Sequence, residues 1–173
     1  MSTEVFISAE KIQARVRELA EMINRDFKGQ DLVVIGVLNG AFMFCADLIR
    51  AINVPINLEF IKASSYGSGT KSSGTVKLSM EFAGSLKGKN ILLVEDIVDT
   101  GLTIKKIFED IKKEGPKTLK LASLLYKPAR NEHYTPIDYL GFEIEDKFVI
   151  GYGLDLDGRY RELPFIGIYH GQN

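Results

Sequence analysis

The stretch Ile91–Thr103, "ILLVEDIVDTGLT", runs from an apolar strand into three acids and a Thr-Gly turn. Its first part continues a predicted strand over Asn90–Val94, whose unbroken apolar run is typical of a strand buried on both faces. Apolar residues at helical spacing then predict a helix over about Thr103–Glu114, ended by Gly115-Pro116. We therefore expect Glu95–Thr103 to form an acidic loop between strand and helix.

The same succession recurs along the chain and indicates the fold class. A predicted strand over Leu32–Leu38 precedes a predicted apolar helix over Ala41–Ile52, and another apolar strand covers Leu119–Lys127. Alternating buried strands and helices favour an α/β fold with a mainly parallel twisted sheet and helices on both faces. Ligands of such sheets bind beyond the carboxyl ends of the strands. Residues that follow strands should share that edge, namely Asn39-Gly40, Glu95–Thr103, Lys127 and Asp155.

The remaining segments complete one expected domain over residues 1–173. Ser8 is placed to cap a helix that continues to about Lys28. Strands over Leu58–Tyr66 and 75–80 flank Gly67–Gly74, where seven of eight residues are Gly, Ser or Thr. Such a composition predicts a hairpin whose tip, about residues 64–76, is flexible. Short strands are expected within 139–144, 148–155 and 164–169.

Composition excludes several classes of protein. The 173 residues carry a formal net charge of -1, so bulk electrostatics do not favour nucleic-acid binding. Cys45 is the one cysteine, which forbids an internal disulfide and fits a reducing compartment. No apolar run of membrane-spanning length and no signal-peptide pattern occur. We expect a cytoplasmic protein with no nucleic-acid or membrane partner.

The acidic turn has the chemistry of a sugar-phosphate site. Backbone N–H groups of a Thr-Gly turn at a helix start can hold a phosphate, assisted by the hydroxyls of Thr100 and Thr103. Glu95 and Asp96 could accept hydrogen bonds from neighbouring sugar hydroxyls. A phosphate-binding turn beside two such acceptors predicts a site for a ribose 5-phosphate. A plain alternative makes Asp99 an ordinary helix N-cap. Neither a Walker lysine nor a GxGxxG pattern is present.

The stretch "VEDIVDTGLT" resembles the signature of type I phosphoribosyltransferases, which bind phosphoribosyl diphosphate. The stretches "VLNGAFMFCADLIR", "SSYGSGT", "LASLLYKPAR", "DKFVIGYGLD" and "RYRELPFIG" are similar, in order and spacing, to the hypoxanthine(-guanine) branch of that family. The resemblance covers about Val33 to Ile168. It implies the type I fold with a small hood and a flexible β-hairpin loop, and a purine salvage reaction that forms IMP or GMP and pyrophosphate.

The resemblance assigns roles to the acidic turn. Glu95 and Asp96 would face the ribose hydroxyls or a Mg²⁺ ion bound to them, and Asp99 would be the general base near purine N7. The 5′-phosphate would lie in the turn, whose substrate-binding residues are expected to be Ile97, Val98, Thr100, Gly101, Leu102 and Thr103.

The resemblance also assigns the purine and pyrophosphate contacts. Lys127 would contact purine O6, Phe148 would stack on the base, and the backbone of Val149 would contact the purine edge. Asp155 would bind Mg²⁺ directly or through water, and Arg161 would bind pyrophosphate. The expected pyrophosphate loop has a cis peptide and consists of Leu38, Asn39 and Gly40; the expected closing loop carries Ser65 and Tyr66.

The partners implied are phosphoribosyl diphosphate and a 6-oxopurine, with Mg²⁺ as cofactor, in a homodimer or homotetramer. Asn39 departs from the pattern because many relatives carry a basic residue there. Three alternatives stay open: a transferase for xanthine and guanine, an RNA-binding regulator with this fold, and an interaction module with an inactive site. Every expected catalytic acid is present, and no basic excess supports the regulator.

Overall fold

A computed structural model of the chain describes residues 3–65, 76–79, 82 and 84–171. The elements follow in the order β1 (Thr3–Ile7), α1 (Ala9–Asp26), β2 (Leu32–Leu38), α2 (Phe42–Ala51), β3 (Ile56–Ser65), β4 (Val76–Ser79), β5 (Asn90–Val98), α3 (Leu102–Lys113), β6 (Thr118–Tyr126), a 3₁₀ turn η1 (Pro128–Arg130), β7 (Tyr139–Glu143), β8 (Val149–Ile150) and β9 (Ile166–Tyr169).

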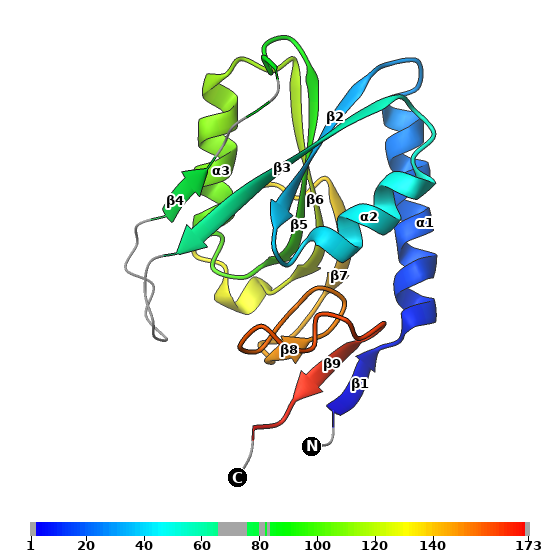
Figure 1. Ribbon diagram of the computed structural model, residues 1–173, viewed down its shortest axis with the longest axis vertical. Helices are drawn as coiled ribbons and strands as arrows, with labels where there is room; N and C mark the ends of the chain where they lie inside the picture. Colours follow the sequence, from blue (N-terminus) through cyan, green and yellow to red (C-terminus); the bar gives the residue numbers. More distant parts are fainter. Residues whose placement is uncertain (1–2, 66–75, 80–81, 83, 172–173) are drawn as a thin grey trace.

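The main sheet has the order β4-β3-β2-β5-β6-β7 (Figure 1). The five strands from β3 to β7 in this order pair in parallel, and β4 pairs antiparallel with β3 at one edge. Helices α1 and α2 cover one face of the sheet and α3 covers the other (Figure 1). The predicted fold class, a mainly parallel sheet with helices on both faces, is confirmed.

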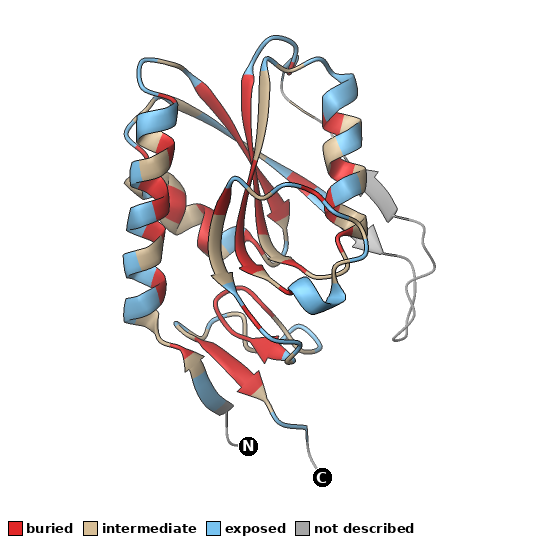
Figure 2. Ribbon diagram, turned by 180° about the vertical axis from the view of Figure 1, so that it is seen from behind, coloured by how far each residue is buried: buried red, intermediate tan, exposed pale blue. Residues whose placement is uncertain are grey.

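Two hydrophobic cores hold these layers together. Alternate residues of β2 point to opposite faces, so Val34 packs in the core with α1 and α2 while Val33 and Ile35 pack in the core with α3. Both faces are covered, which explains why β2 reads as an unbroken apolar run. Figure 2 shows the buried residues concentrated on the central strands and on the inner faces of the helices.

A second, antiparallel sheet of order β1-β9-β8 forms a hood below the main sheet (Figure 1). Strand β1 has no counterpart in the sequence-based prediction. Apolar and polar residues alternate only weakly in β1, and Val5 is half exposed. Backbone pairing with β9 therefore stabilises this strand more than burial of an apolar face does. The loop after β8 carries Asp155, which therefore comes from the hood and not from a strand end of the main sheet.

The acidic loop was predicted wrongly at its start. Strand β5 continues to Val98, four residues beyond the predicted end, so Glu95 and Asp96 lie on the strand. The extension is stabilised by β6, whose Ser123 pairs with Glu95 and whose Tyr126 pairs with Val98. Polar residues do not end a strand when a partner strand runs alongside.

The hairpin expectation is confirmed at its base. Strands β3 and β4 pair antiparallel, with Ser65 opposite Val76 at the last described register position. Tyr66 and the tip between the strands lie outside the described residues. Among the helices that the structure describes, none has the length and apolar character needed to cross a membrane.

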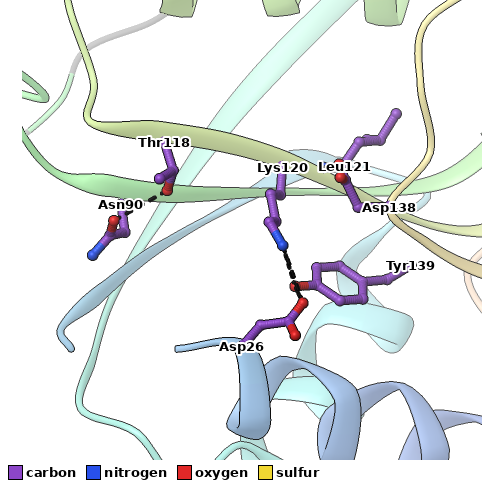
Figure 3. Close-up of polar contacts among 7 residues, drawn as sticks. All are labelled: Asp26, Asn90, Thr118, Lys120, Leu121, Asp138 and Tyr139. Carbon is purple, nitrogen blue, oxygen red and sulfur yellow. Dashed lines mark hydrogen bonds and ion pairs between the residues drawn. The ribbon is translucent and has the colours of Figure 1, made fainter. Parts of the chain in front are cut away.

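A polar cluster fastens the end of α1 to the neighbouring strands (Figure 3). Asp26 at the end of α1 accepts a hydrogen bond from the Tyr139 hydroxyl at 2.6 Å and one from Lys120 Nζ at 3.0 Å. Lys120 Nζ also lies 3.2 Å from the Tyr139 oxygen. Burial raises the pKa of the Tyr139 hydroxyl, and the hydrogen bond to Asp26 raises it further. The hydroxyl therefore stays protonated and acts as the donor.

We expect Tyr139→Phe to destabilise the protein by about 1–2 kcal/mol, because it removes a hydrogen bond to a carboxylate inside this cluster. Urea unfolding followed by circular dichroism measures the change. The matched control is Tyr134→Phe, since Tyr134 is exposed and should lose nothing. Equal stabilities of the two variants would contradict the prediction.

Candidate active site

The carboxyl ends of β2, β5 and β6 bring three predicted segments together. Strand β2 pairs with β5, and β5 pairs with β6, so Leu38–Gly40, Glu95–Thr103 and Lys127 follow neighbouring strands at one edge. The Lys127 N–H donates to Val98 O at 3.0 Å, which ties the ends of β5 and β6 directly. The peptide bond between Leu38 and Asn39 is cis, as expected.

The turn from Asp99 to Thr103 is shaped by Gly101. This residue is the N-cap of α3 with φ +85°, so Asp99 is not the cap that the alternative interpretation proposed. A Cβ atom at Gly101 would stand 2.2 Å from the backbone oxygen of His133. The N–H groups of Glu132 and His133 both donate to Thr100 O at 3.0 Å. These two bonds hold the loop that contains Glu132 and His133 against the turn.

This turn leaves a small polar cavity at a helix N-terminus. The cavity measures about 90 Å³ and is lined by the end of β5 and the start of α3, between Glu95 and Ile104. The N-cap Gly101 has no side chain to cap α3, and Thr100 Oγ1 accepts only the Leu102 N–H, at 3.4 Å. The N–H groups of the first turn of a helix have no partner within it. The helix dipole adds positive potential at the same end. An anion is the ligand that this geometry favours.

Glu95, which is buried, and Asp96, which is half-buried, form an acidic pair at the cavity. Glu95 is 7% exposed, and its Oε1 accepts a hydrogen bond from the Asp96 N–H at 3.0 Å. Burial raises the pKa of Glu95 well above 4.5, and the negative charge of Asp96 raises it further. Burial also raises the pKa of Asp96, against the opposing effects of its hydrogen bonds and the nearby Arg161 charge. The pair is short of positive charge.

Two glycines allow the hood to approach this pair closely. A Cβ at Gly40 would overlap Asp96 Oδ2, at 1.6 Å. A Cβ at Gly153, which has φ +98°, would stand 2.1 Å from Gly40 O. The loop after β8 therefore packs on the Leu38–Gly40 loop, which itself packs on Asp96.

Arg161 and Asp155 join the site from the hood. Arg161 Nη1 donates to Gly153 O at 2.5 Å, and its Nη2 lies 2.9 Å from Asp155 Oδ1. The other Asp155 oxygen accepts the Gly158 N–H at 2.8 Å. The three expected metal-binding acids do not converge: within the described part of the chain, no three acidic, His or Cys side chains form a group suited to a metal.

A contact of Asp146 links Lys127, at the end of β6, to the segment that carries Phe148 and Val149. Lys127 is 7% exposed, and its Nζ lies 3.5 Å from Asp146 Oδ1. Asp146 is two residues before Phe148, so this contact brings the start of β8 to Lys127. Phe148 is 52% exposed despite its size, and one side of its ring meets Tyr169 edge-on at 6.0 Å between centroids. Val149 is buried beside it in β8.

Arg130 and Asp146 belong to the site although sequence reasoning did not select them. Arg130 Nε lies 2.8 Å from Asp99 Oδ1, and its Nη1 lies 3.6 Å from Asp146 Oδ2. Both residues stand within stretches quoted for the family resemblance, "LASLLYKPAR" and "DKFVIGYGLD". Their mutual contacts depend on how β6 and β8 meet, which spacing alone does not indicate.

A larger cavity of about 370 Å³ lies at the opposite, amino-terminal edge of the sheet, lined by residues such as Gln30, Asn90 and Lys117. It contains none of the predicted site residues. The smaller cavity is the better candidate because it combines a helix N-terminus, the buried Glu95 and the residues of the signature stretch.

Glu95→Gln should make the protein more stable at pH 7.5. The folded-state pKa of Glu95 is raised above 4.5, so ionising this side chain costs folding free energy as the pH rises above that value. The amide removes that cost. Thermal unfolding at pH 4.5 and pH 7.5 without metal should show a melting-temperature gain of the variant over the wild type that grows with pH.

The matched control is Glu21→Gln, an exposed glutamate of α1, which should show no such dependence on pH. A Glu95→Gln variant that melts below the wild type at pH 7.5, or a gain equal at both pH values, would contradict the burial argument.

Comparisons with known proteins agree with this geometry. Residues 7–157 match the model of the phosphoribosyl transferase domain. The chain is 44% identical to hypoxanthine phosphoribosyltransferase of Escherichia coli strain K12 over 168 residues, 96% of this chain and 94% of that protein. It is 45% identical to hypoxanthine-guanine phosphoribosyltransferase of Mycobacterium bovis over 169 residues, 94% of this chain and 84% of the other.

A solved structure of a hypoxanthine-guanine phosphoribosyltransferase from Bacillus anthracis has a TM-score of 0.91 and 45% identity, covering 96% of this chain and 98% of that one. The family model spans most of the chain, and the relatives align along nearly its whole length. This chain belongs to the phosphoribosyltransferase family.

Proposed function

We propose that the protein transfers the 5-phosphoribosyl group of phosphoribosyl diphosphate to hypoxanthine, and also to guanine, giving IMP or GMP and pyrophosphate. Relatives that are about 44% identical carry names for this activity. The observation that carries the proposal is the N-terminus of α3, where the N-cap Gly101 has no side chain, together with its 90 Å³ cavity, which the buried Glu95 lines.

In this reaction the turn holds the sugar phosphate. Backbone N–H groups at the start of α3 bind the 5′-phosphate, assisted by the hydroxyls of Thr100 and Thr103. Ile97 and Val98 line the same cavity, and Leu102 begins the helix. Glu95 and Asp96 accept hydrogen bonds from the ribose hydroxyls, in addition to those that they already accept from the backbone N–H groups of Asp96 and Ile97. Binding of this kind orients the anomeric carbon toward the base.

The purine lies between Phe148 and the ends of β5 and β6. The exposed Phe148 ring stacks on the base, and the Val149 backbone contacts its edge. Lys127 donates to O6, which favours a 6-oxo ring because an ammonium has only hydrogens to offer. As N9 bonds to the anomeric carbon and pyrophosphate leaves, Asp99 accepts the proton from N7.

The pyrophosphate group lies between Leu38–Gly40 and the hood. Arg161, with its planar fork of donors, is suited to a diphosphate and already stands near Asp96. Asn39 is exposed and uncharged, so the loop contributes amides rather than a cation.

Mg²⁺ fits the donor set of Glu95 and Asp96. The pair offers adjacent carboxylate oxygens, the ligands that Mg²⁺ prefers, in a place where burial disfavours uncompensated negative charge. When bound, the ion supplies positive charge to the diphosphate. Asp155 is held by Arg161 and the Gly158 N–H, so we propose that it contacts the ion through water.

Three further expectations belong to the proposal. Ser65, Tyr66 and the loop around them would close over the reacting centre and exclude water. The location would be cytoplasmic. A homo-oligomer, dimer or tetramer, is supported by large apolar side chains that α2 and β3 leave exposed, namely Phe42, Leu58 and Phe60.

The activity is tested by incubating the protein with phosphoribosyl diphosphate, Mg²⁺ and each of hypoxanthine, guanine, xanthine, adenine and uracil, followed by chromatography of the nucleotides. We expect IMP and GMP, and no product from adenine or uracil. Omission of Mg²⁺ should stop product formation. A chain that converts none of the five bases under these conditions would disprove the proposed function.

Asp99→Asn should leave the fold intact and lower kcat by about 10²–10⁴, the usual contribution of a positioned general base. The amide keeps the shape of the side chain but cannot accept the N7 proton. Steady-state kinetics with hypoxanthine measure the loss, and an unchanged melting temperature serves as the control for folding. Turnover within about twofold of wild type would rule out Asp99 as the base.

A further inference from the structure

We infer that Arg130 is a positioning residue that orients the Asp99 carboxylate toward the purine, at one end of an ion-pair chain that continues through Asp146 to Lys127. The inference rests on the proposed function, because it takes Asp99 as the base and Lys127 as the contact to O6. It adds two residues that the sequence pattern did not select.

The four side chains form a continuous series of ion pairs in the structure. Arg130 Nε lies 2.8 Å from Asp99 Oδ1, which makes the two side chains an ion pair. Asp99 Oδ1 is buried and accepts no hydrogen bond from the described residues, so the guanidinium is its one close charged neighbour among the ion pairs that they form. Arg130 Nη1 lies 3.6 Å from Asp146 Oδ2, and Asp146 Oδ1 lies 3.5 Å from Lys127 Nζ. Two acidic side chains alternate with two basic ones, so the formal charges of this ion-pair series sum to zero beside the acidic pair of β5.

The backbone places Arg130 accurately for this contact. Arg130 ends the short 3₁₀ turn η1 that follows Lys127, and its N–H donates to Lys127 O at 3.2 Å. The next residues cover the turn of Asp99: Asn131 Nδ2 lies 3.5 Å from Asp99 O, and the Glu132 N–H donates to Thr100 O. Arg130 is thus fixed to both strand ends that bear the purine contacts.

The contact engages one oxygen of a two-oxygen base. Arg130 is paired with Asp99 Oδ1, which is buried, so Oδ2 is the oxygen left to accept the proton from purine N7. A carboxylate held at one oxygen loses rotational freedom, so the other oxygen is kept in the orientation that proton transfer requires. Asp146 attracts the guanidinium from a second direction and also contacts Lys127, so the two purine-facing side chains share one network.

Isolated exposed ion pairs contribute little, and Arg130 is itself 46% exposed. Its proposed effect is therefore on orientation at the reacting centre rather than on the stability of the fold. This distinction defines the test, because a merely structural residue would change the melting temperature and act independently of Asp99.

The test is a double-mutant cycle with Arg130→Gln, Asp99→Asn and the double variant, assayed with hypoxanthine and phosphoribosyl diphosphate. Arg130→Gln should lower kcat by about 10- to 100-fold, by analogy with residues that orient a metal ligand. The KM for phosphoribosyl diphosphate should stay within about twofold. In the Asp99→Asn background, Arg130→Gln should have no further effect on kcat, since it acts only through that carboxylate.

Two further variants sharpen the outcome. Arg130→Lys keeps the cation without the fork and should recover part of the lost kcat. Arg17→Gln removes an exposed arginine of α1 and should match the wild type. An active wild type with Arg130→Gln indistinguishable from Arg17→Gln would overturn the inference alone, as would losses in kcat that multiply in the double variant. An inactive wild-type protein would overturn the proposed function as well.

Discussion

Two adjacent carboxylates, the buried Glu95 and the half-buried Asp96, lie at the end of a strand, and the rest of the site is arranged around that constraint. Burial and mutual repulsion raise the pKa of Glu95, and burial raises that of Asp96. Within a protein, such groups are tolerated when donors or cations approach them. The nearby Arg161 charge opposes the rise in the pKa of Asp96, and under the proposed function the hydroxyls of the sugar would donate further hydrogen bonds to the pair.

Close backbone approach makes this arrangement possible. Gly40 lets Asp96 lie over the Leu38–Gly40 loop, and Gly153 lets the hood pack on Gly40. Gly101 lets the loop that contains His133 pack on the turn from Asp99 to Thr103. At each place a Cβ atom would stand within about 2.2 Å of another atom. The hood and the main sheet thus meet through glycines, and this meeting brings Arg161 and Phe148 to residues far away in the chain.

Electrostatic order at the site follows the same layout. Acidic side chains of β5 face the proposed sugar and metal positions, whereas the purine side is lined by the charge-balanced chain of Asp99, Arg130, Asp146 and Lys127. A neutral purine needs no net charge in the surface that binds it. A diphosphate with its metal ion, in contrast, needs charged groups in its binding surface. The formal net charge of -1 for the whole chain conceals this local separation.

The sequence alone determined the layers and most of the motif positions. Buried strands such as β2 have an apolar run whose ends are set by flanking polar residues, and its predicted bounds, Leu32–Leu38, match the structure. Local signals failed where pairing decides. Strand β5 runs on through Glu95 and Asp96 because β6 lies beside it, and β1 exists because β9 pairs with it.

Only the tertiary structure decided how the motifs combine. Residue spacing does not reveal that Asp155 is held by Arg161 in the hood, or that Arg130 reaches Asp99. These contacts join segments whose separation along the chain is unrelated to their distance in space. The sequence therefore specified which chemical groups are available, while the packing of hood on sheet determined which of them face each other.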